Sequence, residues 1–297
     1  DRPERVRPVA APEPRPPVPA RPRRLSVTEV ETWMRDPYAV YARHVLRLSA
    51  LDPIAADPGA AERGQFIHRA LDAFVREHPG ALPADPVRRL LALGEAAFGD
   101  HLAQPDVWAF WWPRFERVAR WFVERERTRR ETIRPLATEA AGSLALDGPA
   151  GPFTLVAKAD RIDLMPDGTL AILDYKTGSP PSPREVELGF APQLPLEAAI
   201  AEAGGFAGVE ARGVSALAFW KLSGGDPPGE EKALPPEDLA RLVEDARRGL
   251  ETLVRTFDDP GTPYRALPRP ERAPRFSDYG HLARVQEWST AGADGQD

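Results

Sequence analysis

The chain has 297 residues, of which 42% are hydrophobic and 28% charged, so it can form one large domain or two small ones. Its lack of cysteine excludes disulfides, thiolate zinc sites and cysteine-ligated iron–sulfur clusters, and fits a reducing cytoplasm. The net charge of −6 excludes a globally basic nucleic-acid binder, although a local basic patch remains compatible with it. There is no apolar run long enough for a membrane span and no N-terminal apolar region typical of a secretory signal.

Residues 1–24 are rich in proline and arginine, which predicts a linker that is disordered or in polyproline II conformation. The chain begins inside this linker and without Met, so we expect a fragment of a larger protein whose missing part lies on the N-terminal side. A folded domain is predicted over residues 25–290, followed by a flexible tail over 291–297.

Apolar residues at helical spacing dominate the first half of the chain. Helices are predicted, in chain order, after a cap at Ser26 or Thr28, over 38–45, from Gly64 to the Pro79-Gly80 break, after Asp85-Pro86 and over 108–130. The last of these begins with a Trp-rich stripe that could stack on bases. Its helical spacing favours packing in the core instead.

The hydrophobic pattern then changes to the alternation of strands. Strands are predicted over 136–146, 153–165, 169–176 and 214–222, and helices over 192–203 and 236–257. Asp147-Gly148 and Pro166-Asp167-Gly168 supply the turns between the first three strands. This order predicts an α/β fold in which helices flank a small mixed β-sheet.

The segment LAILDYKTG, residues 170–178, combines a buried strand with charged residues at its end. Alternation places Asp174 and Lys176 on one face of the strand and Tyr175 on the other. Such charges are costly at the end of a buried strand unless they are paired or functional. The segment alone is therefore compatible with a structural salt bridge or with an active site.

The preceding strand, VAKADRIDLM, adds a second carboxylate. Asp160 alternates with the apolar residues Ile162 and Leu164, so it should face inward, while Arg161 and Asp163 should be solvated or paired on the other face. A hairpin would bring Asp160 near Asp174, and a divalent cation would relieve their repulsion. Oxygen ligands suit Mg²⁺ or Mn²⁺. A lysine alongside could orient or activate a water and stabilise charge on a phosphate.

Four segments, in this order, resemble the motifs of RecB-type nucleases of the PD-(D/E)xK fold. RGQFIHRALDAF resembles the G-x-x-x-H helix through Gly64 and His68, and KADRID resembles the G-x-x-D strand through Asp160. DYKTG is the core motif as it stands, and PQLPLEAA occupies the place of the Q-x-x-x-Y helix through Gln193. LSVTEVETWMRDPYAVYARHVLRL and FSDYGHLARVQEW resemble the C-terminal nuclease domain of the AddB family, so the likeness extends over 25–290.

The resemblance implies a role for each matching residue. The metal ligands for Mg²⁺ or Mn²⁺ would be His68, Asp160, Asp174 and the backbone carbonyl of Tyr175. Lys176 would help activate the attacking water, and Gln193 would shape the site or hold DNA. Glu139 and Arg161 would support the site or contact phosphate.

The activity implied by the resemblance is a metal-dependent DNA exonuclease. It would act within a helicase–nuclease complex in double-strand-break repair and recombination. The implied partners are DNA, an AddA-type helicase–nuclease subunit and the missing N-terminal part of the same chain.

The chain also departs from the family's pattern. Some AddB relatives hold an iron–sulfur cluster through cysteines, which this chain lacks altogether. Position 197 is Glu where the family has Tyr, so the role of that Tyr is in doubt, and Glu197 could lie on the surface of its helix. The family's Gly in G-x-x-D is Lys158 or Ala159 here, depending on register.

Two other functions compete with nuclease activity. One is a catalytically inactive nuclease-fold domain that binds DNA or acts as a scaffold, which the intact set of His68, Asp160, Asp174 and Lys176 disfavours. The other is an unrelated α/β hydrolase, which is disfavoured because no G-x-S-x-G elbow or P-loop is found. Without a P-loop, this chain is not expected to hydrolyse ATP.

Overall fold

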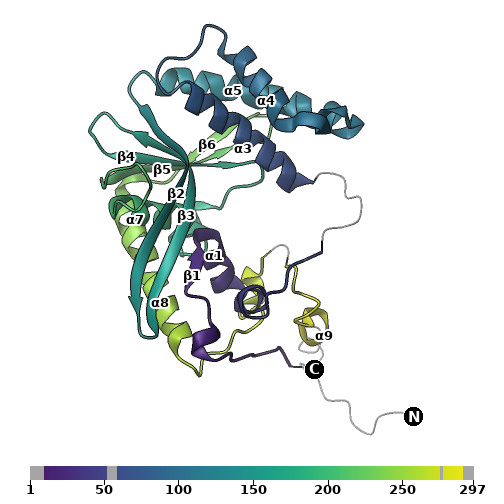
Figure 1. The fold of residues 1–297 in the computed structure, drawn as a ribbon, viewed down its shortest axis with the longest axis vertical. Coiled ribbons are helices and arrows are strands. Elements are labelled where there is room, and N and C mark those ends of the chain that lie inside the picture. Colours follow the sequence, from purple (N-terminus) through teal and green to yellow (C-terminus); the bar gives the residue numbers. More distant parts are fainter. Residues whose placement is uncertain (1–9, 52–58, 275–276, 290–297) are drawn as a thin grey trace. The chain divides into compact units, whose positions relative to one another are not determined.

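The computed structural model describes residues 10–51, 59–274 and 277–289 (Figure 1). Two compact units are formed, each from separate parts of the chain. Unit 1 takes its described residues from 1–52, 145–155 and 248–297, and unit 2 takes its described residues from 53–144 and 156–247. No described helix is long and apolar enough to cross a membrane.

Unit 1 begins with a strand and a capped helix. Its elements are η1 (Val18–Ala20), β1 (Arg24–Ser26), α1 (Val27–Arg35), α2 (Pro37–Val40), the π-helical turn η2 (Tyr41–Val45), η6 (Pro270–Arg272) and α9 (Val285–Ser289). The Glu29 amide donates to Ser26 Oγ at 3.2 Å, and the Ser26 amide donates to Glu29 Oε2 at 2.9 Å. This reciprocal capping box confirms Ser26, rather than Thr28, as the helix cap.

Residues 10–24 belong to the segment whose composition predicts a linker. Arg21 in this segment is 3% exposed, and its guanidinium donates to the carbonyls of Pro16, Phe257 and Asp259 at 2.7–3.0 Å. This stretch is therefore held by hydrogen bonds within unit 1. Residues 1–9 and the predicted tail over 291–297 lie outside the described residues, and the domain boundaries stay predictions.

Three helices of unit 2 pack together (Figure 1): α3 (Ala60–Glu77), α4 (Pro86–Phe98) and α5 (Trp112–Arg129). The 3₁₀ turn η3 (Gly99–Ala103) and the π-helical turn η4 (Val107–Trp111) connect α4 to α5. The predicted long helix over 108–130 is thus a π-helical turn followed by a regular helix. The buried cluster between these helices and the sheet includes Phe66, Phe74, Phe115, Phe122, Tyr175 and Trp220.

The described residues contain six strands in one sheet, with the order β1-β3-β4-β5-β6 and with β2 paired to β3. The strands of the sheet other than β1 are β2 (Arg134–Gly148), β3 (Gly151–Leu164), β4 (Leu170–Lys176), β5 (Val214–Lys221) and β6 (Glu230–Ala233). β4 is antiparallel to β3 and parallel to β5, which makes the sheet mixed, as predicted. β6 has no apolar alternation in its sequence EEKA, and the sequence patterns predicted neither it nor the three-residue β1.

The remaining helices follow β4 along the chain: α6 (Pro183–Glu187), α7 (Gln193–Glu202) and α8 (Leu239–Asp258, after the 3₁₀ turn η5, Pro236–Asp238). α7 packs on β4 and β5, and residues 194–201 are all buried. Because α7 is buried nearly all round, it has little amphipathic character, as expected for an interior helix.

Candidate active site

The register of β3 and β4 places two carboxylates at the same end of the strand pair. Arg161 pairs with Leu173, and continuing this antiparallel register by one residue sets Asp160 opposite Asp174. The Tyr175 amide donates to Asp160 Oδ2 at 2.7 Å, which fixes the Asp160 carboxylate against β4. The hairpin therefore forms as the sequence alternation predicts.

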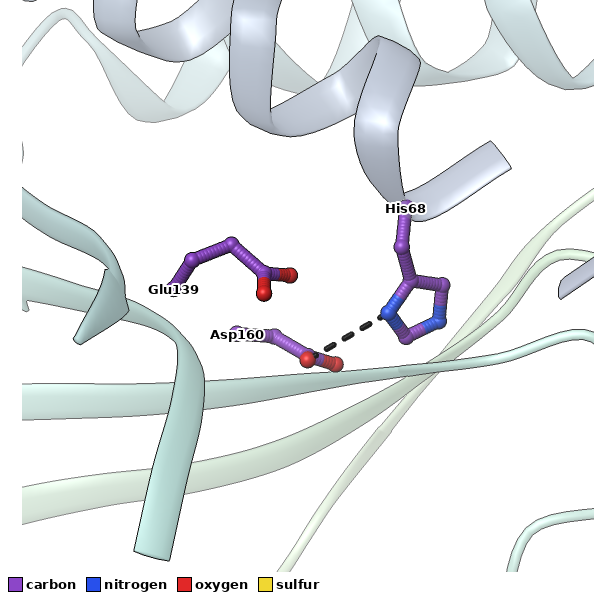
Figure 2. A group of neighbouring side chains, drawn as sticks. All are labelled: His68, Glu139 and Asp160. Carbon is purple, nitrogen blue, oxygen red and sulfur yellow. Dashed lines mark ion pairs between the residues drawn. The ribbon is translucent and has the colours of Figure 1, made fainter. Parts of the chain in front are cut away.

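His68 reaches this end of the sheet from α3. Its Nδ1 lies 3.3 Å from Asp160 Oδ1, and Figure 2 shows the imidazole pointing from the helix toward the carboxylate. A carboxylate oxygen of Glu139, on β2, joins them, so that one potential ligand atom from each residue lies within 4.8 Å of the other two. Glu139 was expected only to support the site, yet its position is equivalent to that of a ligand.

The backbone of Glu139 is unusual for a strand. Its φ is 49°, in the left-handed region that costs a residue with a side chain about 1–3 kcal/mol. Its carboxylate also forms an ion pair with Lys158. β2 therefore departs from regular geometry at the residue whose carboxylate faces His68 and Asp160 (Figure 2).

Asp174 belongs to a second, adjoining group that faces α7. Lys176 Nζ lies 2.7 Å from Asp174 Oδ2 and donates to Gln193 Oε1 at 3.0 Å. The Gln193 amide donates to Asp174 Oδ1 and, at 3.2 Å, to Glu197 Oε1. Lys176 and Asp174 thus share a face, as predicted.

Tyr175 points to the opposite face of β4. Its ring lies 6.1 Å from that of Phe122 and 5.9 Å from that of Trp220, within the buried cluster. The role of its backbone carbonyl as a metal ligand stays a prediction.

Burial makes the charge of the second group costly. It raises the pKa of Asp174 to about 6, against the lowering effect of Lys176 and with a further increase from Asp160. Burial, and then Asp174, also raise the pKa of Glu197 well above its usual range. Without a metal ion, the carboxylates at this end of the sheet are therefore incompletely neutralised by the surrounding protein.

The two cations of the site retain their protons more readily than usual. Burial lowers the pKa of His68, but the hydrogen bond and charge of Asp160 outweigh it and raise the pKa overall. For Lys176, burial likewise opposes the effect of Asp174, which raises the pKa overall. Lys176 is therefore suited to supply positive charge rather than to accept a proton.

Glu197 does not lie on the surface of its helix. It is 1% exposed and faces Gln193, so the sequence-based expectation of a surface residue is wrong. The physical reason is that α7 is covered on nearly every side, which its position in the sequence motif did not reveal.

Arg161 also differs from its expected environment. It is fully buried, and its guanidinium donates to Asp163 Oδ1 at 2.6 Å and to Glu126 on α5. Arg129 and Arg130 bind the same two carboxylates, Asp163 and Glu126, at 2.9 and 2.7 Å. Arg161 is therefore paired rather than solvated, and contact with a phosphate is wrong because the guanidinium is sealed inside this network. A structural role remains.

A cavity of about 540 Å³ opens at the first group of residues. Its lining includes Gly64, Gln65, His68, Arg69, Glu139, Lys158, Asp160, Tyr175, Lys176 and Thr177. A Cβ on Gly64 would lie 3.3 Å from Thr177 Oγ1, so glycine allows α3 to pass close to the end of β4. Arg69 and Lys158 were not predicted as cavity residues, although the first follows His68 and the second alternates with Asp160.

Comparison with known proteins identifies the family. The family model of the PD-(D/E)XK nuclease superfamily matches residues 24–269. The B-type component of an ATP-dependent helicase/deoxyribonuclease from Desulforudis audaxviator is 30% identical over 275 residues, which is 80% of this chain and 22% of that protein. The protein of the same name from Moorella thermoacetica is 29% identical over 205 residues, 59% of this chain and 17% of that protein.

Other relatives carry no functional name. An "Uncharacterized protein" of Rickettsia bellii is 30% identical over 182 residues, 61% of this chain. The chain spans 22% of that relative's length, about a fifth. The crystal structure of SSO0001 aligns with 76% of this chain and 76% of its own, with 11% identity and a TM-score of 0.30.

Proposed function

The chain belongs to the PD-(D/E)XK nuclease superfamily, and from this membership we propose that it hydrolyses the phosphodiester bonds of DNA with Mg²⁺ or Mn²⁺. One observation carries the proposal: an imidazole and two carboxylates, from α3, β2 and β3, converge on the wall of a cavity that Lys176 also lines. A purely structural salt bridge between Asp174 and Lys176 would not require this convergence.

The donor set fits a hard divalent cation. His68, Glu139 and Asp160 offer one nitrogen and two oxygens whose ligand atoms lie within 4.8 Å of one another. Asp174 and the Tyr175 carbonyl, which the family resemblance implies as ligands, are proposed to complete the set. When bound, such an ion supplies Lewis-acid polarisation of a phosphoryl oxygen.

Lys176 is the residue best placed to stabilise negative charge developing on the phosphate. Asp174 and Gln193 hold its ammonium by contacts of 2.7 and 3.0 Å, while the side chain lines the cavity. A preorganised donor of this kind contributes about 10²–10³-fold to rate. Gln193 is thus a positioning residue, and Arg69 and Lys158 on the cavity wall can contact the flanking phosphates.

We further propose that the nuclease is an exonuclease of an AddB-type helicase–nuclease involved in double-strand-break repair and recombination. Support comes from the names of the two helicase/deoxyribonuclease relatives. An AddA-type partner protein and an N-terminal part of the same polypeptide are the corresponding partners. Since this chain spans about a fifth of the relatives it matches, these partners belong to the proposal alone.

Degradation of end-labelled single-stranded DNA tests the activity. Wild-type protein should degrade the strand with Mg²⁺ and not with EDTA, and Asp174→Ala and Lys176→Ala should each lose at least about 100-fold of the rate. Lys232→Ala is the matched control, because this lysine of β6 is 43% exposed and its ion pair with Glu230 is long, at 3.5 Å. Unchanged cleavage by either site variant would refute the assignment. DNA binding without cleavage by the wild type would favour an inactive scaffold.

A further inference from the structure

The Trp-rich stripe before α5 divides into a buried part and an exposed part. Trp112 is 7% exposed and Phe115 is fully buried, so this end of the stripe packs in the core as its spacing predicts. Trp108 and Phe110, on η4, are instead 56% and 65% exposed. Two large aromatic side chains at neighbouring positions of one turn therefore remain without cover in unit 2.

These exposed aromatics adjoin the helix that lines the cavity. The Trp108 ring stacks on Trp112 with 6.2 Å between centroids and an interplanar angle of 8°. The half-buried Trp111 of the same turn lies 6.3 Å from Phe66 of α3. Phe66 follows Gln65, which lines the cavity together with His68 one turn farther along α3. The aromatic surface and the cavity thus share the first turns of α3.

Three arginines lie beside the same aromatics. The Arg69 guanidinium lies 4.9 Å from the centroid of the Phe66 ring, and Arg114 is exposed at the start of α5. Burial, and then the charge of Arg114, lower the pKa of Arg63, which places these two guanidiniums near each other. None of the three forms an ion pair with a carboxylate of the residues that the structure describes. Their positive charge is thus uncompensated by the described protein.

We propose that these five residues, Trp108, Phe110, Arg63, Arg69 and Arg114, form a platform that binds an unpaired segment of the substrate strand next to the cavity. The assignment of DNA as the occupant rests on the proposed function. Aromatic faces stack on bases of any sequence, and guanidiniums contact phosphates between them. Uncompensated positive charge beside exposed aromatics matches a nucleic-acid strand, which offers both anionic phosphates and flat apolar bases.

Binding measured without cleavage tests the platform. We would titrate a 5′-fluorescein-labelled oligothymidylate with the whole chain in EDTA and follow fluorescence anisotropy. The double substitution Trp108→Ala/Phe110→Ala should weaken affinity about 10- to 100-fold, and Trp108→Tyr should retain most of it. Arg114→Ala should weaken binding and reduce its salt dependence. Controls are Leu282→Ala, which removes a side chain of a residue 45% exposed in unit 1, and Arg88→Ala, whose side chain is 86% exposed on α4.

A second readout separates the platform from the catalytic centre. Bis(p-nitrophenyl) phosphate carries one phosphodiester and no nucleobase, so the double variant should hydrolyse it with Mg²⁺ at the wild-type rate. Wild-type strand affinity in the double variant would overturn the platform, as would an equal loss in Leu282→Ala. Altered self-association by sedimentation with unchanged strand affinity would also overturn it and would assign the aromatics to protein docking.

The outcome is independent of whether the proposed nuclease activity is right. A wild-type chain that binds the strand through the platform but never cleaves it would uphold the platform and refute the nuclease. Cleavage by the wild type with no effect of the double variant on affinity would do the reverse.

Discussion

Glu139 adopts a conformation that a residue with a Cβ normally avoids, and its carboxylate faces His68 and Asp160. A left-handed backbone at a non-glycine residue persists only where the surroundings enforce it, and such residues cluster at functional sites. The ion pair with Lys158 holds the Glu139 side chain at the cavity wall. We therefore treat Glu139 as part of the metal centre rather than as a distant support.

Replacing the Glu139 carboxylate tests this assignment. Glu139→Gln should weaken Mn²⁺ affinity about 10- to 100-fold, because the change removes a negative charge near the ion with little change of shape. Isothermal titration with MnCl₂ measures the effect. Glu124→Gln is the matched control, since the Glu124 side chain on α5 is 70% exposed and forms a surface ion pair with Arg127. Equal affinities for wild type and Glu139→Gln would remove Glu139 from the centre.

Glu197 predicts a pH dependence of stability in the metal-free protein. Burial raises the pKa of this carboxyl above its usual 4.5, so the folded state holds the proton more tightly than the unfolded state. Stability is then greatest below the unfolded pKa and falls as the pH rises from about 4.5 toward the raised value. Glu197→Gln removes this fall.

Thermal unfolding in EDTA at pH 4.5 and pH 8 measures the difference. The Glu197→Gln variant should gain more stability over wild type at pH 8 than at pH 4.5. The exposed Glu187 provides the control through Glu187→Gln, which should leave the pH profile unchanged. The same pH profile in wild type and Glu197→Gln would show that ionisation of Glu197 costs nothing in the folded state.

Among the secondary-structure elements, β3 carries two functions on its two faces. Asp160 faces the cavity, while Arg161 and Asp163 join the buried ion-pair network with Glu126 of α5. The network fixes the strand to the helix layer and so holds Asp160 in place. Removing one member leaves the remaining charges buried and unpaired, which is more costly than the loss of an exposed ion pair.

Arg161→Met should therefore lower the free energy of unfolding by about 3–5 kcal/mol. Urea denaturation gives this quantity directly. Arg127→Ala on α5 should cost at most about 1 kcal/mol, because its ion pair with Glu124 is exposed, with side chains 56% and 70% accessible. If the two substitutions cost the same, the buried network does not stabilise this part of the fold.

The elements that the sequence predicted well are those with a strong local signal. The Ser26 cap, the alternation of β3 and β4 and the turn signals between the strands all correspond to the structure. β6 escaped prediction because EEKA pairs with β5 through its backbone, without an apolar pattern. A strand formed mainly by backbone pairing at a sheet edge leaves little trace in side-chain periodicity.

The limits at the site have a related cause. Alternation showed that Arg161 and Asp160 lie on opposite faces, but it could not show that α5 covers the face of Arg161. The left-handed Glu139 and the burial of Glu197 likewise depend on tertiary contacts. The motif residues of α3, β3 and β4 were predictable, whereas their surroundings required the packed structure.

At the scale of the whole molecule, the site residues His68, Glu139, Asp160, Asp174 and Lys176 all lie in unit 2. Their assembly therefore needs nothing from unit 1 within the described structure. The relatives that the chain matches are about five times longer than the segment they share with it, so further parts are proposed to supply the DNA strand to this centre.

Locating a bound ion tests the central claim most directly. We would soak crystals of the chain in MnCl₂ and measure anomalous diffraction. The predicted result is a manganese peak in contact with His68, Glu139 or Asp174, and Asp160. A structure at saturating Mn²⁺ with no peak there, and with His68 still bonded to Asp160, would contradict the account.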